Sequence, residues 1–369
     1  MNESTLRPAA RPEREYGIDL LKIVAMMFIC ILHVCNNGGI MSRISQDKEF
    51  DTYLLITFLK AATYGAVNIY AMISGYLGWQ KSFKLSRPVM IWLQLVFYTI
   101  LGTALISIFT PSLLTENAWF HSLMPVMNAE YWYMTAYFGM VVLMPLLNVV
   151  IQKTSVRTLS LVLLGVLVVF CVLPTVFDVS VFGLSGGYSM VWLCIMYIAG
   201  GYINRIKKPH PLLCLGIYLL MTVLTCIIRV KGASVILKYT SPTVFIGSVA
   251  LLLAFSQIKL RTKFFKAVIS FTAQLTLGIY LAHVHTFFWD NYLKDCLKQF
   301  AHNNVFIVFL VTLAASAAIF VICGAVDAAR RGLFRLIHIR PLLQRIDKAL
   351  SGVFEKKEDD KNGAPEKTE

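Results

Sequence analysis

The stretch IDLLKIVAMMFICILHVCN, residues 18–36, decides the fold, because it is long and apolar enough to cross a hydrocarbon core of about 30 Å as a helix. It carries Lys22 and His33, and its one acidic residue is Asp19. At about 100° per residue, the spacing places Lys22 and His33 on one helix face, about 16 Å apart along the axis. Ionisable side chains inside a span usually face the bundle interior or a wet cavity, so this face is a candidate site.

Lys22 and His33 also have a purely structural interpretation. Lys22 lies one turn into the helix, so its flexible stem can lift the ammonium into the headgroup region. His33 lies near the other end and can form a hydrogen bond at the membrane interface. Spacing alone leaves both interpretations open.

The composition is that of an integral membrane protein. Of the 369 residues, 57% are hydrophobic and 15% charged, whereas charged residues make up about a quarter of ordinary soluble domains. Apolar stretches of about 20 residues recur along the chain and predict an all-α, polytopic membrane protein with about ten transmembrane helices in one bundle. The predicted spans are 18–36, 61–79, 89–109, 131–151, 157–177, 186–204, 212–230, 240–258, 267–288 and 304–326.

The basic residues indicate the orientation. The net charge of +14 is not gathered in one patch, so we expect no nucleic-acid partner. Lys and Arg cluster instead in alternate loops, which is typical of cytoplasmic segments. We therefore expect a multi-pass protein of the cell (plasma) membrane with both termini in the cytoplasm. The clusters are Arg7, Arg11 and Arg14; Lys81, Lys84 and Arg87; Lys153 and Arg157; Arg205, Lys207 and Lys208; Lys259, Arg261, Lys263 and Lys266; and Arg330, Arg331, Arg335, Arg340 and Arg345.

One loop departs from this charge pattern. Arg229, Lys231 and Lys238 fall on the predicted outer side, with no acidic residue beside them in the sequence. They are either an exception to a statistical rule or a patch that attracts anions at the mouth of a cavity.

The chain divides into a cytoplasmic basic arm at 1–16, a transmembrane domain at 17–326 and a cytoplasmic tail at 327–369. Residues 327–350 mix Leu, Ile and Phe with Arg at helical spacing and predict an amphipathic helix on the inner leaflet. Beyond Gly352 we expect disorder. The eight cysteines include no CxxC pair, so we expect neither a metal site nor a disulfide framework.

The segment GIDLLK at residues 17–22, followed after ten residues by His33, resembles the opening of the acyltransferase 3 family of multi-pass membrane acyltransferases. That opening typically reads Ile/Leu-Asp-x-Leu-Arg and has a histidine at the same distance. Further similar segments are NIYAMISGYL (68–77), YWYMTAYFGMVVLMP (131–145), LGIYLAH (277–283) and YTSPTVFIGSVALLLAF (239–255), the last being similar to a late span of polysaccharide-modifying members. The resemblance extends from about Tyr16 to Ala325.

The resemblance implies a membrane O-acyltransferase. Such enzymes move an acyl group, often acetyl, from cytoplasmic acyl-coenzyme A to a hydroxyl of an exported or cell-surface carbohydrate. It implies acyl-CoA, with acetyl-CoA expected, as the donor substrate and no metal. The expected partners are membrane lipid, a carbohydrate or lipid-linked glycan acceptor, and proteins of polysaccharide biosynthesis. The chain departs from the family at Lys22, where arginine is usual, so a planar fork is replaced by a point charge.

O-acylation needs a base for the acceptor hydroxyl and donors for the developing oxyanion. His33 suits the first role, because an imidazole shielded from water stays neutral and accepts a proton. Our hypothesis makes His33 the base and Lys22 the anchor on the donor side. Asp19 supports Lys22, since residues three apart are neighbours on a helix.

Other polar or aromatic residues are candidates for substrate binding, each with packing or interfacial solvation as the alternative. Within the spans these groups either line the site or form interhelical hydrogen bonds. Tyr280 and His283 are the strongest of them, because they lie one turn apart. The candidates are Asn68, Ser74, Tyr76, Glu130, Trp132, Tyr280 and His283.

Two other classes of protein compete with the enzyme. A proton-coupled transporter also uses membrane histidines and acids, but it often has internal repeats and paired broken spans, and we find neither in the sequence. A non-catalytic partner of a polysaccharide export system is the third possibility.

Overall fold

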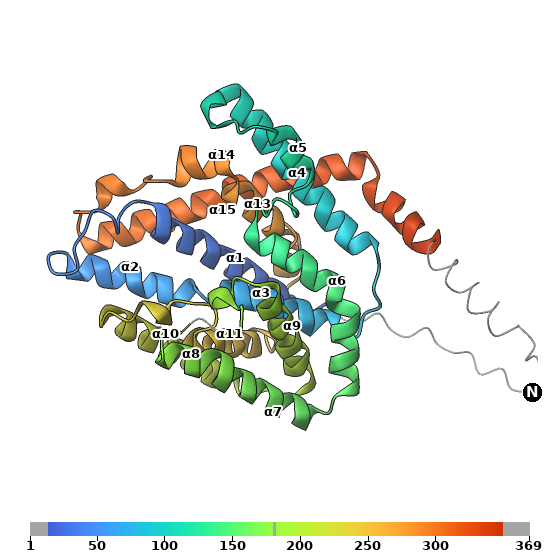
Figure 1. Cartoon of the computed structure of the whole chain (residues 1–369), viewed down its shortest axis with the longest axis horizontal. Coiled ribbons are helices and arrows are strands. Elements are labelled where there is room, and N and C mark those ends of the chain that lie inside the picture. Colours follow the sequence, from blue (N-terminus) through green and yellow to red (C-terminus); the bar gives the residue numbers. More distant parts are fainter. Residues whose placement is uncertain (1–13, 180–181, 350–369) are drawn as a thin grey trace, which may run out of the picture.

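The computed structural model describes residues 14–179 and 182–349, and every regular element there is helical (Figure 1). The all-α, polytopic fold class is therefore confirmed. The helices are α1 (Tyr16–Asn37), α2 (Phe50–Thr63), α3 (Ala66–Gly78), α4 (Ser86–Phe109), α5 (Ala118–Leu123), α6 (Trp132–Lys153), α7 (Val156–Val166), α8 (Leu173–Val176), α9 (Met190–Arg205), α10 (Pro211–Val230), α11 (Pro242–Phe255), α12 (Lys263–Thr272), α13 (Thr276–Val284), α14 (Thr286–Phe288) and α15 (Val305–Leu336). Shorter turns are η1 (Pro111–Leu113), η2 (Leu167–Val172), η3 (Ser185–Gly187), η4 (Ser234–Ile236), η5 (Trp289–Leu293) and η6 (Lys298–Phe300).

Within the described residues, eight helical segments are long and apolar enough to cross a membrane. The predicted spans 186–204 and 240–258 are α9 and α11, of 16 and 14 residues, whereas a straight span needs about 20. Eight residues of each helix are buried, so both pack inside the bundle although they are short. The predicted number of ten spans is therefore not confirmed.

Some element boundaries differ from the predicted ones. α2 begins at Phe50, inside the stretch 37–60 between the first two predicted spans. α15 continues without a break past residue 326 to Leu336, and after a turn the chain is helical again over 339–349. The first thirteen residues of the predicted basic arm and the expected disordered tail lie outside the described residues.

Two membrane segments are broken, contrary to our expectation of unbroken spans. α2 and α3 are separated at Gly65, and α12 and α13 at Gln274. Backbone groups freed at membrane depth need new partners. The hydroxyl of Ser248 donates to the carbonyl of Gly65 at 3.2 Å, and Arg331 donates to the carbonyl of Gln274 at 2.9 Å. These partners come from other helices, so the sequence around each break does not reveal it.

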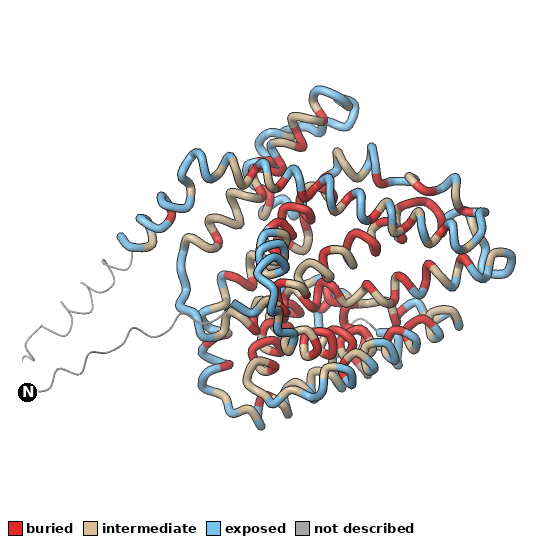
Figure 2. Tube along the Cα trace, turned by 180° about the vertical axis from the view of Figure 1, so that it is seen from behind, coloured by how far each residue is buried: buried red, intermediate tan, exposed pale blue. Residues whose placement is uncertain are grey.

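α1 is the central helix of the bundle. Helices α2, α3, α11, α12, α13 and α15 all pack against it, and Figure 1 shows it among them. Figure 2 shows that buried residues concentrate in the middle of the molecule, while the outer helices are largely exposed. On α10 the exposed side chains include Leu212 and Leu219, which are apolar as expected for a surface in contact with lipid. Among the candidate spans of the described residues, the helix that carries Lys22 and His33 is the most buried.

α3 and α9 approach each other most closely at two glycines. A Cβ on Gly75 would lie 1.8 Å from the carbonyl oxygen of Tyr197, and one on Gly200 would lie 1.9 Å from that of Met72. Small residues allow such backbone contact between membrane helices, which gains close van der Waals packing. The glycine seam, Gly75 and Gly200, therefore fixes α3, one wall of the site described below.

We expect the substitution Gly75→Val to lower the stability of the bundle by about 1–3 kcal/mol or more, because α9 must move away. The measurement is the thermal unfolding midpoint of the purified protein in detergent. Gly165→Val is the matched control, since no atom lies within 4 Å of a Cβ at Gly165 on α7. Equal midpoints for the two variants would contradict the close packing of α3 on α9.

Candidate functional site

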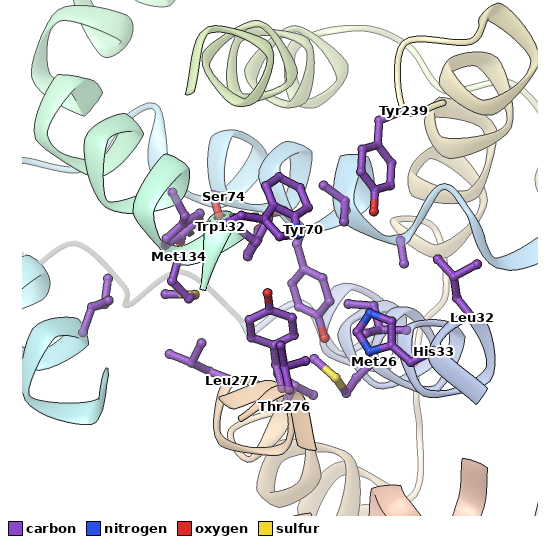
Figure 3. A pocket seen from close by; sticks show the side chains of 18 of the residues that line it. Met26, Leu32, His33, Tyr70, Ser74, Trp132, Met134, Tyr239, Thr276 and Leu277 are labelled. Atoms are coloured by element: carbon purple, nitrogen blue, oxygen red, sulfur yellow. Dashed lines mark hydrogen bonds between the residues drawn. The ribbon is translucent and has the colours of Figure 1, made fainter. Parts of the chain in front are cut away.

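A cavity of about 320 Å³ lies beside the second half of α1, and residues of α3, α6 and α13 also line it (Figure 3). Much of its wall is aromatic. Tyr133 and Tyr137 stand one turn apart on α6 and stack with ring centroids 5.7 Å apart. Trp132 stacks on Tyr239, which precedes α11, at 5.8 Å. We name this space, which His33 also lines, the aromatic cavity.

The broken helices bring their first residues to the aromatic cavity. Ala66 and Val67 at the start of α3 line it, as do Thr276 and Leu277 at the start of α13. Irregular backbone at membrane depth is tolerated where it is buried in protein or lines a cavity. The two breaks therefore belong to the construction of this site.

His33 and His283 form a hydrogen-bonded pair at the wall of the aromatic cavity. Nδ1 of His33 lies 2.9 Å from Nε2 of His283, and Nδ1 of His283 lies 2.6 Å from the carbonyl oxygen of Ile279. A carbonyl only accepts, so Nδ1 of neutral His283 carries the proton and its Nε2 is an acceptor. His33 then donates through Nδ1. Its Nε2 keeps a lone pair and can act as a base.

The surroundings hold the His33 ring in place. His283 is fully buried, and the ring of Trp289 meets His33 edge to face at 5.2 Å. Figure 3 shows His33, Tyr70 and Tyr239 bordering the same space. A base whose second nitrogen is held by a partner has a fixed tautomer and direction, as catalytic histidines require.

Lys22 lies at the other end of the same helix face. Its Nζ donates to Oδ1 of Asp19 at 2.9 Å, and Oδ2 of Asp19 accepts from Arg14 at 2.5 Å. In the described part of the chain, Lys22 does not line the aromatic cavity, whose wall on α1 begins one turn later at Met26. Tyr70, which does line it, donates its hydroxyl to the carbonyl of Lys22 at 2.6 Å. Lys22 thus stands just beyond the cavity.

Other cations surround the Lys22 end of α1. Burial, together with the charges of Arg87 and Lys22, lowers the pKa of Lys81, which follows α3. Lys266 lies over the ring of Tyr16 at 5.1 Å. Positive charge therefore concentrates at this end of the site.

The structure separates the remaining predicted site residues into two groups. Ser74, Trp132 and Tyr280 line the aromatic cavity, and Ser74 shares a hydrogen bond of 3.0 Å with Tyr137. His283 lies directly behind His33. These residues come from helices that are far apart in the sequence.

Asn68, Tyr76 and Glu130 lie elsewhere. The side chain of Asn68 donates to the carbonyl of Tyr239 and accepts from Trp192, both at 2.9 Å, so it ties helices together. Tyr76 accepts from Lys208 at 2.5 Å. Glu130 borders a separate cavity of about 130 Å³.

The sequence analysis missed four tyrosines of the aromatic cavity, Tyr70, Tyr133, Tyr137 and Tyr239, as site residues. All four lie inside segments already singled out by resemblance, and the density of tyrosine in 68–77 and 131–145 was the available signal. Trp289 was not among the candidates, because it falls just beyond the predicted span 267–288; it begins η5 directly after α14, and its ring lies against His33.

The outer basic loop has an acidic neighbour that is distant in sequence, because Nζ of Lys238 lies 3.8 Å from Oδ1 of Asp178. In residues 14–179 and 182–349, no three His, Cys, Asp or Glu side chains are arranged to hold a metal ion.

The comparisons with known proteins agree with this arrangement at the level of the family. A family model described as an acyltransferase domain matches residues 15–326, nearly the whole described chain. No curated protein and no solved structure matches the chain.

Proposed function

Because the chain belongs to the acyltransferase 3 family, we propose that it is a membrane O-acyltransferase that moves an acetyl group from acetyl-coenzyme A to a hydroxyl of an exported or cell-surface carbohydrate. The observation that supports this most is the His33–His283 pair in the aromatic cavity. It supplies a base of fixed tautomer at a space walled by aromatic rings. Trp132 and Trp289 offer flat apolar faces to a sugar ring in the same space.

The proposed reaction balances with His33 alone as proton carrier. Nε2 of His33 takes the proton of the acceptor hydroxyl while its oxygen attacks the carbonyl carbon of the thioester. The bond between that carbon and sulfur then breaks, and the thiolate takes the proton from the imidazolium. The products are an O-acyl ester and the free thiol. His283 remains hydrogen-bonded to His33 and steadies the imidazolium.

The proposed orientation puts the Lys22 end of α1 in the cytoplasm, at the plasma membrane. Arg14, Lys22, Lys81 and Lys266 gather there, as expected for the cytoplasmic side. A phosphorylated donor would meet this end first. The acceptor would approach from the end where α1 finishes and where the backbone N–H of Asp295 donates to the carbonyl of Asn37.

The test uses the full-length protein in inverted membrane vesicles with acetyl-coenzyme A that carries a labelled acetyl group. We expect release of free thiol together with transfer of label to a polymer or lipid-linked sugar. Vesicles from cells that lack the protein are the control. Equal thiol release from both preparations would refute the proposed activity.

A transporter remains the competing function, because broken spans of the kind found at Gly65 and Gln274 are typical of transporters. The two functions differ in what becomes of the thioester. A transporter would carry label across the vesicle membrane and leave it on its original molecule, without release of thiol.

A further inference from the structure

A second cavity, of about 490 Å³, lies at the C-terminal end of α15, between α4 and the break that separates α12 from α13. We name it the arginine cavity. None of its described lining residues is acidic. Its polar and aromatic lining includes Arg330, Arg331, Phe334, Arg335, His338 and Arg340.

Two of the arginines are held by other side chains. Nε of Arg330 donates to Asp327 at 2.7 Å, and Arg331 donates to the side-chain oxygen of Gln274 at 2.6 Å. The guanidinium groups of Arg335 and Arg340 form no hydrogen bond or ion pair with the described residues. The four arginines of the cavity repel one another because they carry like charges. Asp327 neutralises only Arg330. The cavity therefore favours an anion, and one with more than a single charge.

The arginine cavity adjoins the aromatic cavity. Leu277 lines both. A second connection runs through a cavity of about 380 Å³, which shares Arg340 with the arginine cavity and Ile91 with the aromatic cavity. Arg87 borders this connection. A ligand with a charged head and a thin arm could thus occupy both cavities.

We propose that the arginine cavity binds the nucleotide phosphates of the coenzyme A donor while the thioester arm reaches His33 past Leu277. This inference rests on the proposed function, because it takes acyl-coenzyme A as the donor. Guanidinium groups suit phosphate, since their planar forks donate in pairs. Phe334, whose ring lies under the guanidinium of Arg330 at 4.8 Å, adds an aromatic wall beside the arginines.

The test variant is Arg335→Gln/Arg340→Gln in the full-length protein. Both side chains are exposed, so their replacement spares the buried pair of Arg330 and Asp327. We expect the affinity for coenzyme A, measured in nanodiscs of zwitterionic lipid, to fall by about tenfold or more, since hydrogen bonds to charged groups are lost. The affinity for pantetheine, which lacks the nucleotide, should not change.

Arg345→Gln is the matched control, because Arg345 lies on the same C-terminal helical stretch but does not line the cavity. An unchanged affinity of the double variant for coenzyme A would overturn the inference, while thiol release by the wild type would leave the proposed function standing. A second possible occupant of the arginine cavity is the headgroup of an anionic phospholipid, and it predicts a different result. In nanodiscs with anionic lipid, the double variant would then lose bound phospholipid and keep its affinity for coenzyme A, which also overturns the inference.

Discussion

The variant His33→Ala is expected to transfer acyl groups about a hundred to ten thousand times more slowly than the wild type, because the acceptor hydroxyl loses its base. Nε2 of His33 is the nitrogen left unprotonated by the hydrogen bonds to His283 and Ile279. The measurement is the rate of thiol release in inverted vesicles, normalised to the amount of folded protein. The control is His302→Ala, at an exposed histidine that pairs with Glu49 outside the aromatic cavity.

His283→Phe separates the role of the base from that of its partner. Phenylalanine keeps a ring at this buried position but cannot accept from Nδ1 of His33, so we expect a smaller loss of rate. The double variant His33→Ala/His283→Phe should be no slower than His33→Ala, because groups that act as one unit are not additive. Wild-type rates in His33→Ala would refute the assignment of the base.

The second large effect is expected at Asp327. This fully buried carboxylate accepts from Arg330 at 2.7 Å and from the hydroxyl of Tyr98 at 2.8 Å, and it ties α15 to α4. Asp327→Leu leaves the buried guanidinium of Arg330 without a counterion. Breaking a buried pair in this way costs about 3–5 kcal/mol, so we expect a markedly lower unfolding midpoint in detergent.

The paired variant Asp327→Leu/Arg330→Met is the control for this effect. Removing both charges leaves no unpaired ion, so most of the lost stability should return. If the single and the double variant unfold at the same temperature, the ion pair does not account for the loss.

The sequence predicts those features of the site that depend only on residues close together on one helix. The face shared by Lys22 and His33 and the contact between Asp19 and Lys22 follow from the helical repeat. The all-helical class follows from the recurrence of long apolar stretches. These features need no knowledge of which helices touch.

The remainder depends on contacts between distant segments. No periodicity indicates that His283 lies behind His33, since these residues are 250 positions apart. Asn68 is as polar as a site residue, yet its amide donates to the carbonyl of Tyr239 and accepts from Trp192. The break at Gln274 contains no proline and is stabilised by Arg331 of α15. Only the packed bundle shows which polar residues lie at the site and which ones join helices.

The rings that enclose His33 also determine what happens to a donor that arrives before any sugar. A thioester hydrolyses when a water molecule reaches its carbonyl beside a base, and the histidine would serve water as readily as an alcohol. The cavity that these rings wall is about 320 Å³, which is room for several water molecules, so water reaches the thioester until a sugar fills the space. Futile breakdown of the donor is therefore expected when no glycan is present, and it should slow once the glycan displaces the solvent.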